Sequence, residues 1–210
     1  MEFDKIFKSV EEAVYEVMVW LLLLPKTFIR TMTHPIDAMD YINAEWEKNP
    51  DDRFDEYLSP VLLWLLSAVI PITFFVSIAS GAEDVSKKFT DLIYPITFYM
   101  MVIPFVYIAW MEWLNKEPVR RSTLKVSFYR HCYALAPAQL LTILSLGAVF
   151  IHWIFILLPA LILPAYEAVV FKAELEVSYF KAFLYACIPQ IAVLIFIVVV
   201  ILTLPTLPAP

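Results

Sequence analysis

The sequence predicts an all-α integral membrane protein with five transmembrane helices, preceded by an amphipathic N-terminal helix. Composition is the first reason: 61% of the 210 residues are hydrophobic, 17% are charged, and the mean hydropathy is +0.75. Soluble domains are nearer half apolar and a quarter charged. The second reason is that long apolar blocks recur along the chain, each with about the 20 residues that a helix needs to cross a bilayer.

Three of the predicted spans can be assigned directly from these blocks. The block at 57–77 has no charged residue, and the block at 93–113 has Glu112 at its end. The last block, 182–202, has no charged residue. Each is long enough for one transmembrane helix.

The remaining apolar block, 133–171, is 39 residues long. As a single helix it would measure about 58 Å, roughly twice the hydrocarbon thickness of a bilayer. We therefore expect it to fold back as two spans, 131–152 and 153–171. His152 and Trp153 interrupt the block near its middle and suit the headgroup level, so the hairpin is predicted there.

The distribution of lysine and arginine predicts the orientation of these spans. Segments on one side of the five spans hold 13 such residues, and the other side holds Lys87 and Lys88. By the positive-inside rule the N-terminus is cytoplasmic and the C-terminus external, in a plasma membrane or bacterial inner membrane. The predicted organisation is a cytoplasmic or interfacial segment at 1–56, a transmembrane domain at 57–204 and an external tail at 205–210.

The segment at 3–24 has the periodicity of an amphipathic helix that Pro25 is expected to end. Its apolar residues recur at intervals of three and four: Phe3, Phe7, Val10, Val14, Val17, Leu21 and Leu24. Charged residues occupy the opposite face. Such a helix can lie on the cytoplasmic membrane surface or along the bundle, or it can pair with its own copy through a heptad seam. Prolines also bracket a short predicted helix at 36–47.

Five polar residues are candidate functional contacts. Glu167 lies in an apolar run but close to the cytoplasmic end of its span, where we expect it to contact Arg130 or His131 or to reach water. The alternative is a gating or proton-linked role. Gln139 and Gln190 lie within spans, and each amide needs a partner across helices or an aqueous cavity.

Other motifs favour simple structural explanations. The acidic stretch "DDRFDEY" suits a helix N-terminus, and "HPIDAMD" has too few fixed ligands for a metal site. Two glycines exclude glycine-rich phosphate loops, and the net charge of −6 gives no basic surface for nucleic acid. We predict no catalytic residue, metal or cofactor, and no enzyme. Prolines within the spans free carbonyl groups that neighbouring helices can satisfy or that can line an ion path.

Four segments resemble the Yip1-domain family of five-span membrane proteins, over about residues 20–204. They are "LLLLPKTFIRTMTHP" and "DEYLSP" at the first span, "YRHCYALAP" at the third and "SYFKAFLYACIPQ" at the fifth. Ser59 stands where the family often has a glycine. The resemblance implies a cytoplasmic N-terminus, and the short loops are typical of prokaryotic members, so the trafficking role of eukaryotic members is not transferred.

Two functions are compatible with these observations. The first is a non-enzymatic polytopic membrane protein that acts as a scaffold or accessory subunit through protein or lipid contacts. The second is a homo-oligomeric channel or transporter for ions or small solutes. The expected partners are the lipid bilayer and a second copy or another membrane protein.

Overall fold

The computed structural model describes residues 2–79, 83–116, 120–148 and 157–203. Within these ranges the chain forms helices and no strand, which confirms the all-α class. The elements are α1 (Glu2–Thr33), α2 (Pro35–Glu47), a 3-10 turn η1 (Pro50–Asp52), α3 (Pro60–Ala79), α4 (Glu83–Asn115), α5 (Arg121–Ala148), α6 (Leu157–Leu175) and α7 (Tyr179–Thr203).

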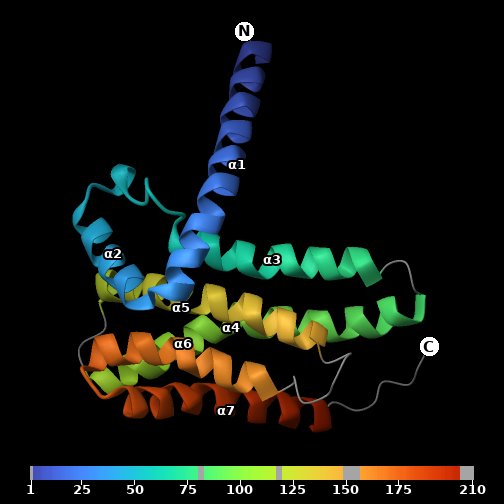
Figure 1. Ribbon diagram of the computed structural model, residues 1–210, viewed down its shortest axis with the longest axis vertical. Helices are drawn as coiled ribbons and strands as arrows, with labels where there is room; N and C mark the ends of the chain where they lie inside the picture. Colours follow the sequence, from blue (N-terminus) through green and yellow to red (C-terminus); the bar gives the residue numbers. More distant parts are fainter. Residues whose placement is uncertain (1, 80–82, 117–119, 149–156, 204–210) are drawn as a thin grey trace.

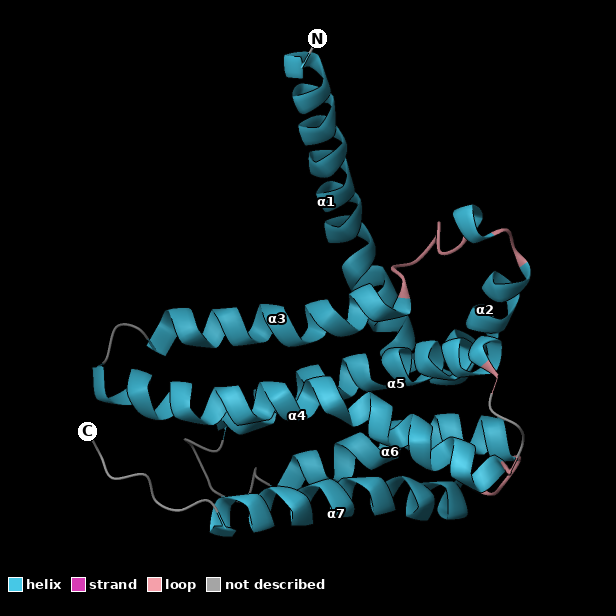
Figure 2. Ribbon diagram, turned by 180° about the vertical axis from the view of Figure 1, so that it is seen from behind, coloured by secondary structure: helices cyan, strands magenta, loops and turns pink. Residues whose placement is uncertain are grey.

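Helices α3 to α7 lie side by side, with successive helices running in opposite directions, as Figures 1 and 2 show. Helix α5 is central, because it contacts α1, α2, α3, α4 and α6. It is buried on all sides over residues 131–139, where Ala134, Ala136 and Ala138 are each at most 1% exposed. Small side chains let neighbouring helices approach closely, so α5 holds the other helices around itself.

The structure divides the long apolar block between α5 and α6, as expected from its length. The hairpin predicted at His152 and Trp153 lies outside the described residues. Helices α4 and α5 begin ten residues before the predicted spans at 93 and 131. The added turns are polar, because a span prediction marks only the apolar part of a helix.

Pro25 does not end the first helix, which corrects our expectation: α1 continues to Thr33 with Pro25 inside it. Packing beyond the proline explains this result. Thr27 and Thr31 are at most 2% exposed, and Thr27 Oγ1 accepts a hydrogen bond from Leu58 N at 3.0 Å. These contacts fix the C-terminal turns of α1 on the bundle, while the rest of α1 projects away crosswise to α3–α7 (Figure 1).

Helix α2 agrees with the short helix predicted at 36–47, starting one residue earlier at Pro35. It contacts α1, α5 and α6, and its residues Ala38, Met39 and Ile42 are at most 2% exposed. It therefore covers the ends of the bundle helices on the side where α1 is attached.

One helical stretch of the described residues, Tyr179–Phe196 in α7, is long and apolar enough to cross a membrane. The apolar stretch Pro60–Phe74 in α3 is shorter. One such helix is weak evidence for a membrane, since the core helix of a soluble protein passes the same test, and it does not support the five predicted transmembrane helices. However, 22% of the α7 stretch is buried, so most of its apolar surface lacks a protein partner among the described residues.

Two carbonyl groups that prolines release receive side-chain donors from neighbouring helices. A proline cannot bond the carbonyl four residues earlier; Pro104 thereby frees Met100 O, and Pro189 frees Tyr185 O. Gln139 Nε2 of α5 lies 3.1 Å from Met100 O. Trp110 Nε1 of α4 lies 3.1 Å from Tyr185 O. At these two positions, neighbouring helices satisfy the freed groups.

We predict that Trp110→Phe lowers the free energy of unfolding by about 0.5–1.5 kcal/mol, because Tyr185 O loses its donor. In a Pro189→Ala background the restored backbone N–H can bond Tyr185 O, so the same substitution should cost less. Thermal unfolding in detergent of the four variants of this cycle measures the difference. Trp113→Phe is the matched control, since Trp113 stacks on Trp110 but is 65% exposed. Equal costs in both backgrounds would contradict the assignment.

Candidate functional site

A histidine and a glutamate form a buried pair between α5 and α6. His131 Nδ1 lies 2.5 Å from Glu167 Oε2, and both side chains are 0% exposed. The antiparallel packing of α5 and α6 brings the two residues to the same level of the bundle. The expected contact of Glu167 with His131 is therefore present. The expectation that Glu167 might reach water is wrong for this structure, because the carboxyl is enclosed.

Aromatic rings surround this pair. The ring of Tyr107 from α4 stacks on His131 with centroids 6.0 Å apart, and Phe171 from α6 meets His131 edge-on at 6.1 Å. His131 Nε2 and Glu167 Oε1 have no hydrogen-bond partner among the described residues. The pair thus links three helices and retains one unused polar atom on each side chain.

Arg130 does not contact Glu167, which corrects the alternative that the sequence left open. Its guanidinium bonds the Glu174 carboxylate of α6 and the Asn43 side chain of α2. The side chains of Arg130 and Glu174 are 16% and 19% exposed. Arg130 projects toward the end of the bundle, where α2 provides a second polar partner, and so connects α2, α5 and α6.

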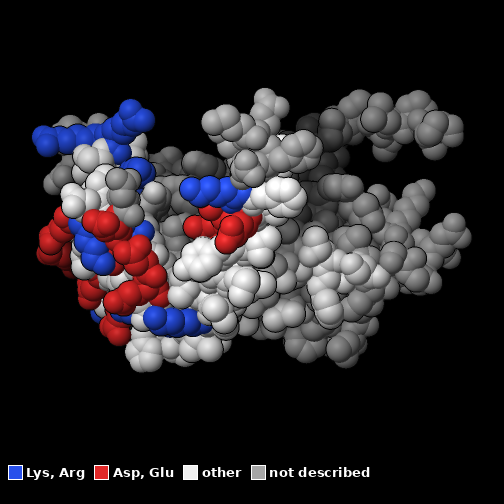
Figure 3. Space-filling view, turned by 90° about the horizontal axis from the view of Figure 1, so that it is seen from above, with Lys and Arg blue, Asp and Glu red and all other residues white. Residues whose placement is uncertain are grey.

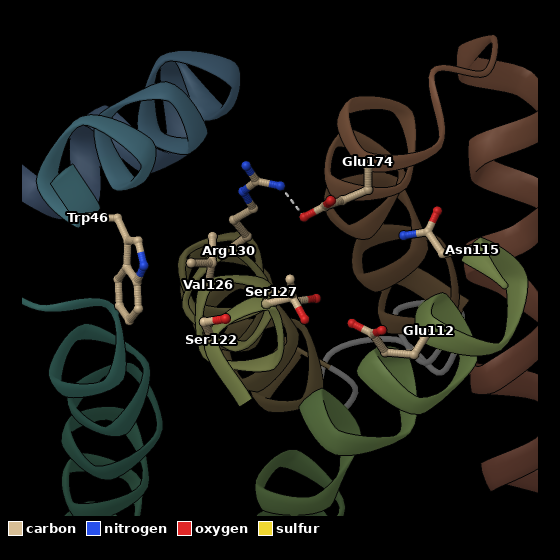
Figure 4. A pocket seen from close by; sticks show the side chains of 9 residues that line it. Trp46, Glu112, Asn115, Ser122, Val126, Ser127, Arg130 and Glu174 are labelled. Atoms are coloured by element: carbon tan, nitrogen blue, oxygen red, sulfur yellow. Dashed lines mark hydrogen bonds and ion pairs between the residues drawn. The ribbon is translucent and has the colours of Figure 1, made fainter. Parts of the chain in front are cut away.

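A pocket of about 400 Å³ lies beside this ion pair, at the ends of α2, α4, α5 and α6 (Figure 4). Figure 4 places Trp46 on one side of α5 and Glu112, Asn115 and Glu174 on the other. The lining residues are Trp46, Glu112, Asn115, Ser122, Thr123, Val126, Ser127, Arg130 and Glu174. Carboxylate, guanidinium, amide and hydroxyl groups therefore face one small space.

The loop after α2 is fixed next to this pocket by Glu45, which is 1% exposed. Glu45 accepts hydrogen bonds from Lys48 Nζ at 2.5 Å and from Phe54 N at 2.6 Å. Burial acts to raise the pKa of this carboxyl, but the hydrogen bonds outweigh it and lower the pKa of Glu45 below its usual value. Arg53, from the same loop, covers the Trp46 ring at 4.3 Å, so Trp46 is held in place.

The two predicted span glutamines are both buried. Gln139 Oε1 accepts a hydrogen bond from Ser67 Oγ of α3 at 2.9 Å, in addition to the bond that its Nε2 donates to Met100 O. This amide bonds across helices, one of the two environments expected. Gln190 of α7 is 5% exposed.

Sequence reasoning missed most of the pocket. It selected Arg130 but not Glu112, Ser127 or Glu174, and it placed Trp46 only within a short helix. These residues lie near helix ends, where charged and hydroxyl side chains are common. Antiparallel pairing of α5 with α6 was the one pattern that could have suggested Glu174 as a partner of Arg130.

The described residues contain no group of three or more His, Cys, Asp or Glu side chains that could hold a metal ion. Comparisons with protein-family models, with curated proteins and with solved structures give no match for this chain. The resemblance to the Yip1-domain family therefore stays a prediction from short segments.

We predict that Glu167→Gln and His131→Gln each lower the free energy of unfolding by about 1–3 kcal/mol, because each leaves a buried polar group with a weaker partner. The double variant should be less destabilised than the sum of the two, with a coupling of at least about 0.5 kcal/mol. Thermal unfolding in detergent gives these values.

Arg130→Gln is the matched control for this cycle, because Arg130 bonds Glu174 and not Glu167. Its effect should add to that of Glu167→Gln. Coupling of Glu167 to Arg130 with additivity toward His131 would contradict the observed pairing.

Proposed function

We propose that the chain is a five-span membrane protein with a cytoplasmic N-terminus, and that it acts as a non-catalytic scaffold or accessory subunit through its N-terminal helix. The observation that carries this proposal is the projection of α1 away from the bundle, with apolar side chains exposed along it. The experiments below address the membrane topology and the role of α1 separately.

The proposal of five spans rests on the lengths of α3–α7 and on the apolar side chains exposed along them, although only Tyr179–Phe196 of the described residues is both long and apolar enough to cross a membrane. The shortest of α3–α7 is α6 with 19 residues, or about 28 Å at 1.5 Å per residue, close to the hydrocarbon thickness. Large apolar side chains are exposed along these helices, including Val69, Phe74, Phe98, Phe105, Leu144, Leu161, Leu184, Ile191 and Phe196. Apolar surface spread over several parallel helices suits lipid better than water.

Charge supports the proposed orientation. Among the described residues, Figure 3 shows one group of Lys, Arg, Asp and Glu side chains at the α2 end and a second near the middle of the view, on α1. The pair of Arg130 and Glu174, the buried Glu45 and the basic start of α5 all lie at the α2 end. A cytoplasmic location is the usual place for such a lysine- and arginine-bearing end.

The direction of α1 is that of a helix lying along the membrane surface. If α3–α7 cross the bilayer, a helix crosswise to them at their charged end lies in the plane of the cytoplasmic interface (Figure 2). Its exposed apolar residues include Phe7, Val10, Val14, Val17 and Leu21, from 47% to 71% exposed. An amphipathic helix in that plane buries its apolar face among acyl chains and keeps its charged face in water.

The charged face of α1 favours insertion over electrostatic attraction. Between residues 2 and 16 it contains Glu2, Asp4, Glu11, Glu12 and Glu16 against Lys5 and Lys8. This net negative face gives little attraction to anionic lipids, so the apolar face supplies the affinity. A second copy of α1 is the competing occupant of the same face.

One observation favours the channel or transporter as a second candidate. The buried pair of His131 and Glu167 retains Nε2 and Oε1 without partners among the described residues, and such intramembrane groups often mark proton or ion pathways. In that case Glu167→Gln would alter flux or its pH dependence in liposomes, in addition to its effect on stability.

Reporter fusions test the proposed topology. A fusion at Lys116 should report the cytoplasm, because Lys116 follows the second proposed span. A fusion at Pro210 should report the outside, because Pro210 follows the fifth. Identical signals from both positions would overturn the five-span arrangement.

We further predict that Phe7→Asp with Val14→Asp releases α1 from the membrane, because two charges then lie on its apolar face. Hydrogen exchange or limited proteolysis in liposomes should show faster exchange or cleavage across residues 6–24 while the bundle is unchanged. Lys8→Asp with Glu12→Asp is the matched control, since it makes the same change in net charge on the polar face.

The size of the purified particle separates the two occupants of the apolar face. Lipid insertion predicts unchanged size for both double variants. A shift from dimer to monomer on Phe7→Asp with Val14→Asp would assign the face to a second copy, and unchanged protection of α1 would reject both.

A further inference from the structure

An apolar groove on the outside of the bundle shares the lining residue Glu112 with the pocket beside Arg130. The groove has a volume of about 400 Å³ and is lined by Phe105, Ile108, Ala109, Glu112, Trp113 and Leu124. From Glu112 the groove follows α4 for seven residues to Phe105, about 10 Å along the helix. A polar cavity next to an apolar groove matches an amphiphile with a compact head and a chain.

The polar pocket has opposite electrostatic character at its two ends. The C-terminus of α4 contributes Glu112 and Asn115, and a helix C-terminus carries a partial negative charge. The N-terminus of α5 contributes Ser122 and Thr123, and a helix N-terminus presents free N–H groups and a partial positive charge. Arg130 and Glu174 largely neutralise each other, so the pocket suits a group with separated positive and negative charges.

Buried polar atoms in this pocket lack partners, which points to a ligand independently of the helix termini. Ser127 is 4% exposed, and its Oγ has no hydrogen-bond partner among the described residues. Arg130 Nε is also buried without a partner there. Both residues line the pocket. A hydroxyl and a guanidinium N–H can each donate to a phosphate oxygen.

The cationic part of the ligand is better matched by a primary ammonium than by a quaternary one. An ammonium donates three hydrogen bonds, and Glu112, Glu174 and Asn115 supply acceptor oxygens around the same space. A quaternary ammonium is held mainly by aromatic faces. Trp46 is the aromatic residue of this pocket, and Arg53 and Lys125 already lie over its ring at 4.3 and 5.4 Å.

We propose that this pocket and groove bind one molecule of phosphatidylethanolamine, with the phosphate at the first turn of α5 and Ser127, the ammonium at Glu112, and an acyl chain along the groove. The proposal rests on the proposed membrane location, since the groove would then open to lipid at the cytoplasmic interface. The α2 end would then bind a specific lipid headgroup, while the apolar face of α1 inserts into the bilayer without such specificity.

The test is native mass spectrometry of the full-length protein in detergent, titrated with phosphatidylethanolamine, phosphatidylcholine or phosphatidylglycerol of identical chains. Phosphatidylethanolamine should bind at about tenfold lower concentration than the other two, the scale of one charge-assisted hydrogen bond. Glu112→Gln should remove this preference. Ala109→Trp should weaken binding of the lipid by filling the groove from an exposed position. Glu176→Gln is the matched control, because Glu176 is exposed at the same end but outside the pocket.

Membrane integration is tested first, by treating membranes that contain the protein with alkaline buffer. An extracted protein would refute the proposed function, whereas a resistant protein without lipid preference would refute only this site. Preference for the other lipids, or a preference that survives both Glu112→Gln and Ala109→Trp, would overturn the site as general lipid contact. Thermal unfolding is also measured with soluble phosphoethanolamine. If this compound stabilises the protein as strongly as the lipid does, the pocket binds a soluble ligand and the lipid proposal is overturned. The supporting result is a preference that Glu112→Gln abolishes, binding that Ala109→Trp weakens, and both retained in Glu176→Gln.

Discussion

The satisfaction of polar groups inside an apolar bundle is the constraint on which this structure depends. Helix α5 meets the constraint at several levels, since Gln139 reaches α3 and α4, His131 reaches Glu167 of α6, and Tyr133 donates to Leu58 O at 2.6 Å. Once buried, each of these groups costs free energy unless it is paired. These hydrogen bonds therefore determine which helices pack against α5, and they also stabilise that packing.

Leu58 shows how this constraint fixes the N-terminal part of the chain. Its N–H bonds Thr27 of α1 and its carbonyl accepts from Tyr133 of α5. The start of α3 is thus bonded to side chains of two other helices at one residue. This joint sets the direction in which α1 leaves the bundle, and the exposure of the apolar face of α1 follows from that direction.

The α2 end of the molecule combines rigidity with exposed chemistry. Glu45, Arg53 and Arg130 bond the loop after α2 and the helix ends to one another. The pocket between these ends consequently has fixed walls, and its polar atoms cannot easily turn toward each other. A preformed site with unpaired donors is better suited to a ligand than a mobile one, because less order is lost on binding.

Sequence patterns were sufficient to predict helices, since periodicity and apolar length are local properties. They located α2 within one residue, required the division between α5 and α6, and brought Glu167 near His131 by antiparallel folding. They failed at Pro25, because α1 stays helical past the proline, where Thr27 Oγ1 accepts a hydrogen bond from the distant Leu58 N. They also failed at Arg130, whose guanidinium bonds Glu174 of α6 and Asn43 of α2 and not Glu167.

By itself, the sequence determined the all-α class, the amphipathic character of α1 and the pairing of the buried glutamate with a residue near 131. These properties follow from residue type and spacing along one or two helices. Only the tertiary structure decided that Glu167 is enclosed, that Arg130 belongs to Glu174 and Asn43, and that α1 stands crosswise to the bundle. It also decided which donors satisfy the carbonyls freed by Pro104 and Pro189. The physical reason is that these outcomes depend on the relative positions of three or more helices, and hydrogen-bond geometry at a distance of about 3 Å is not encoded in the spacing of residues along any one of them.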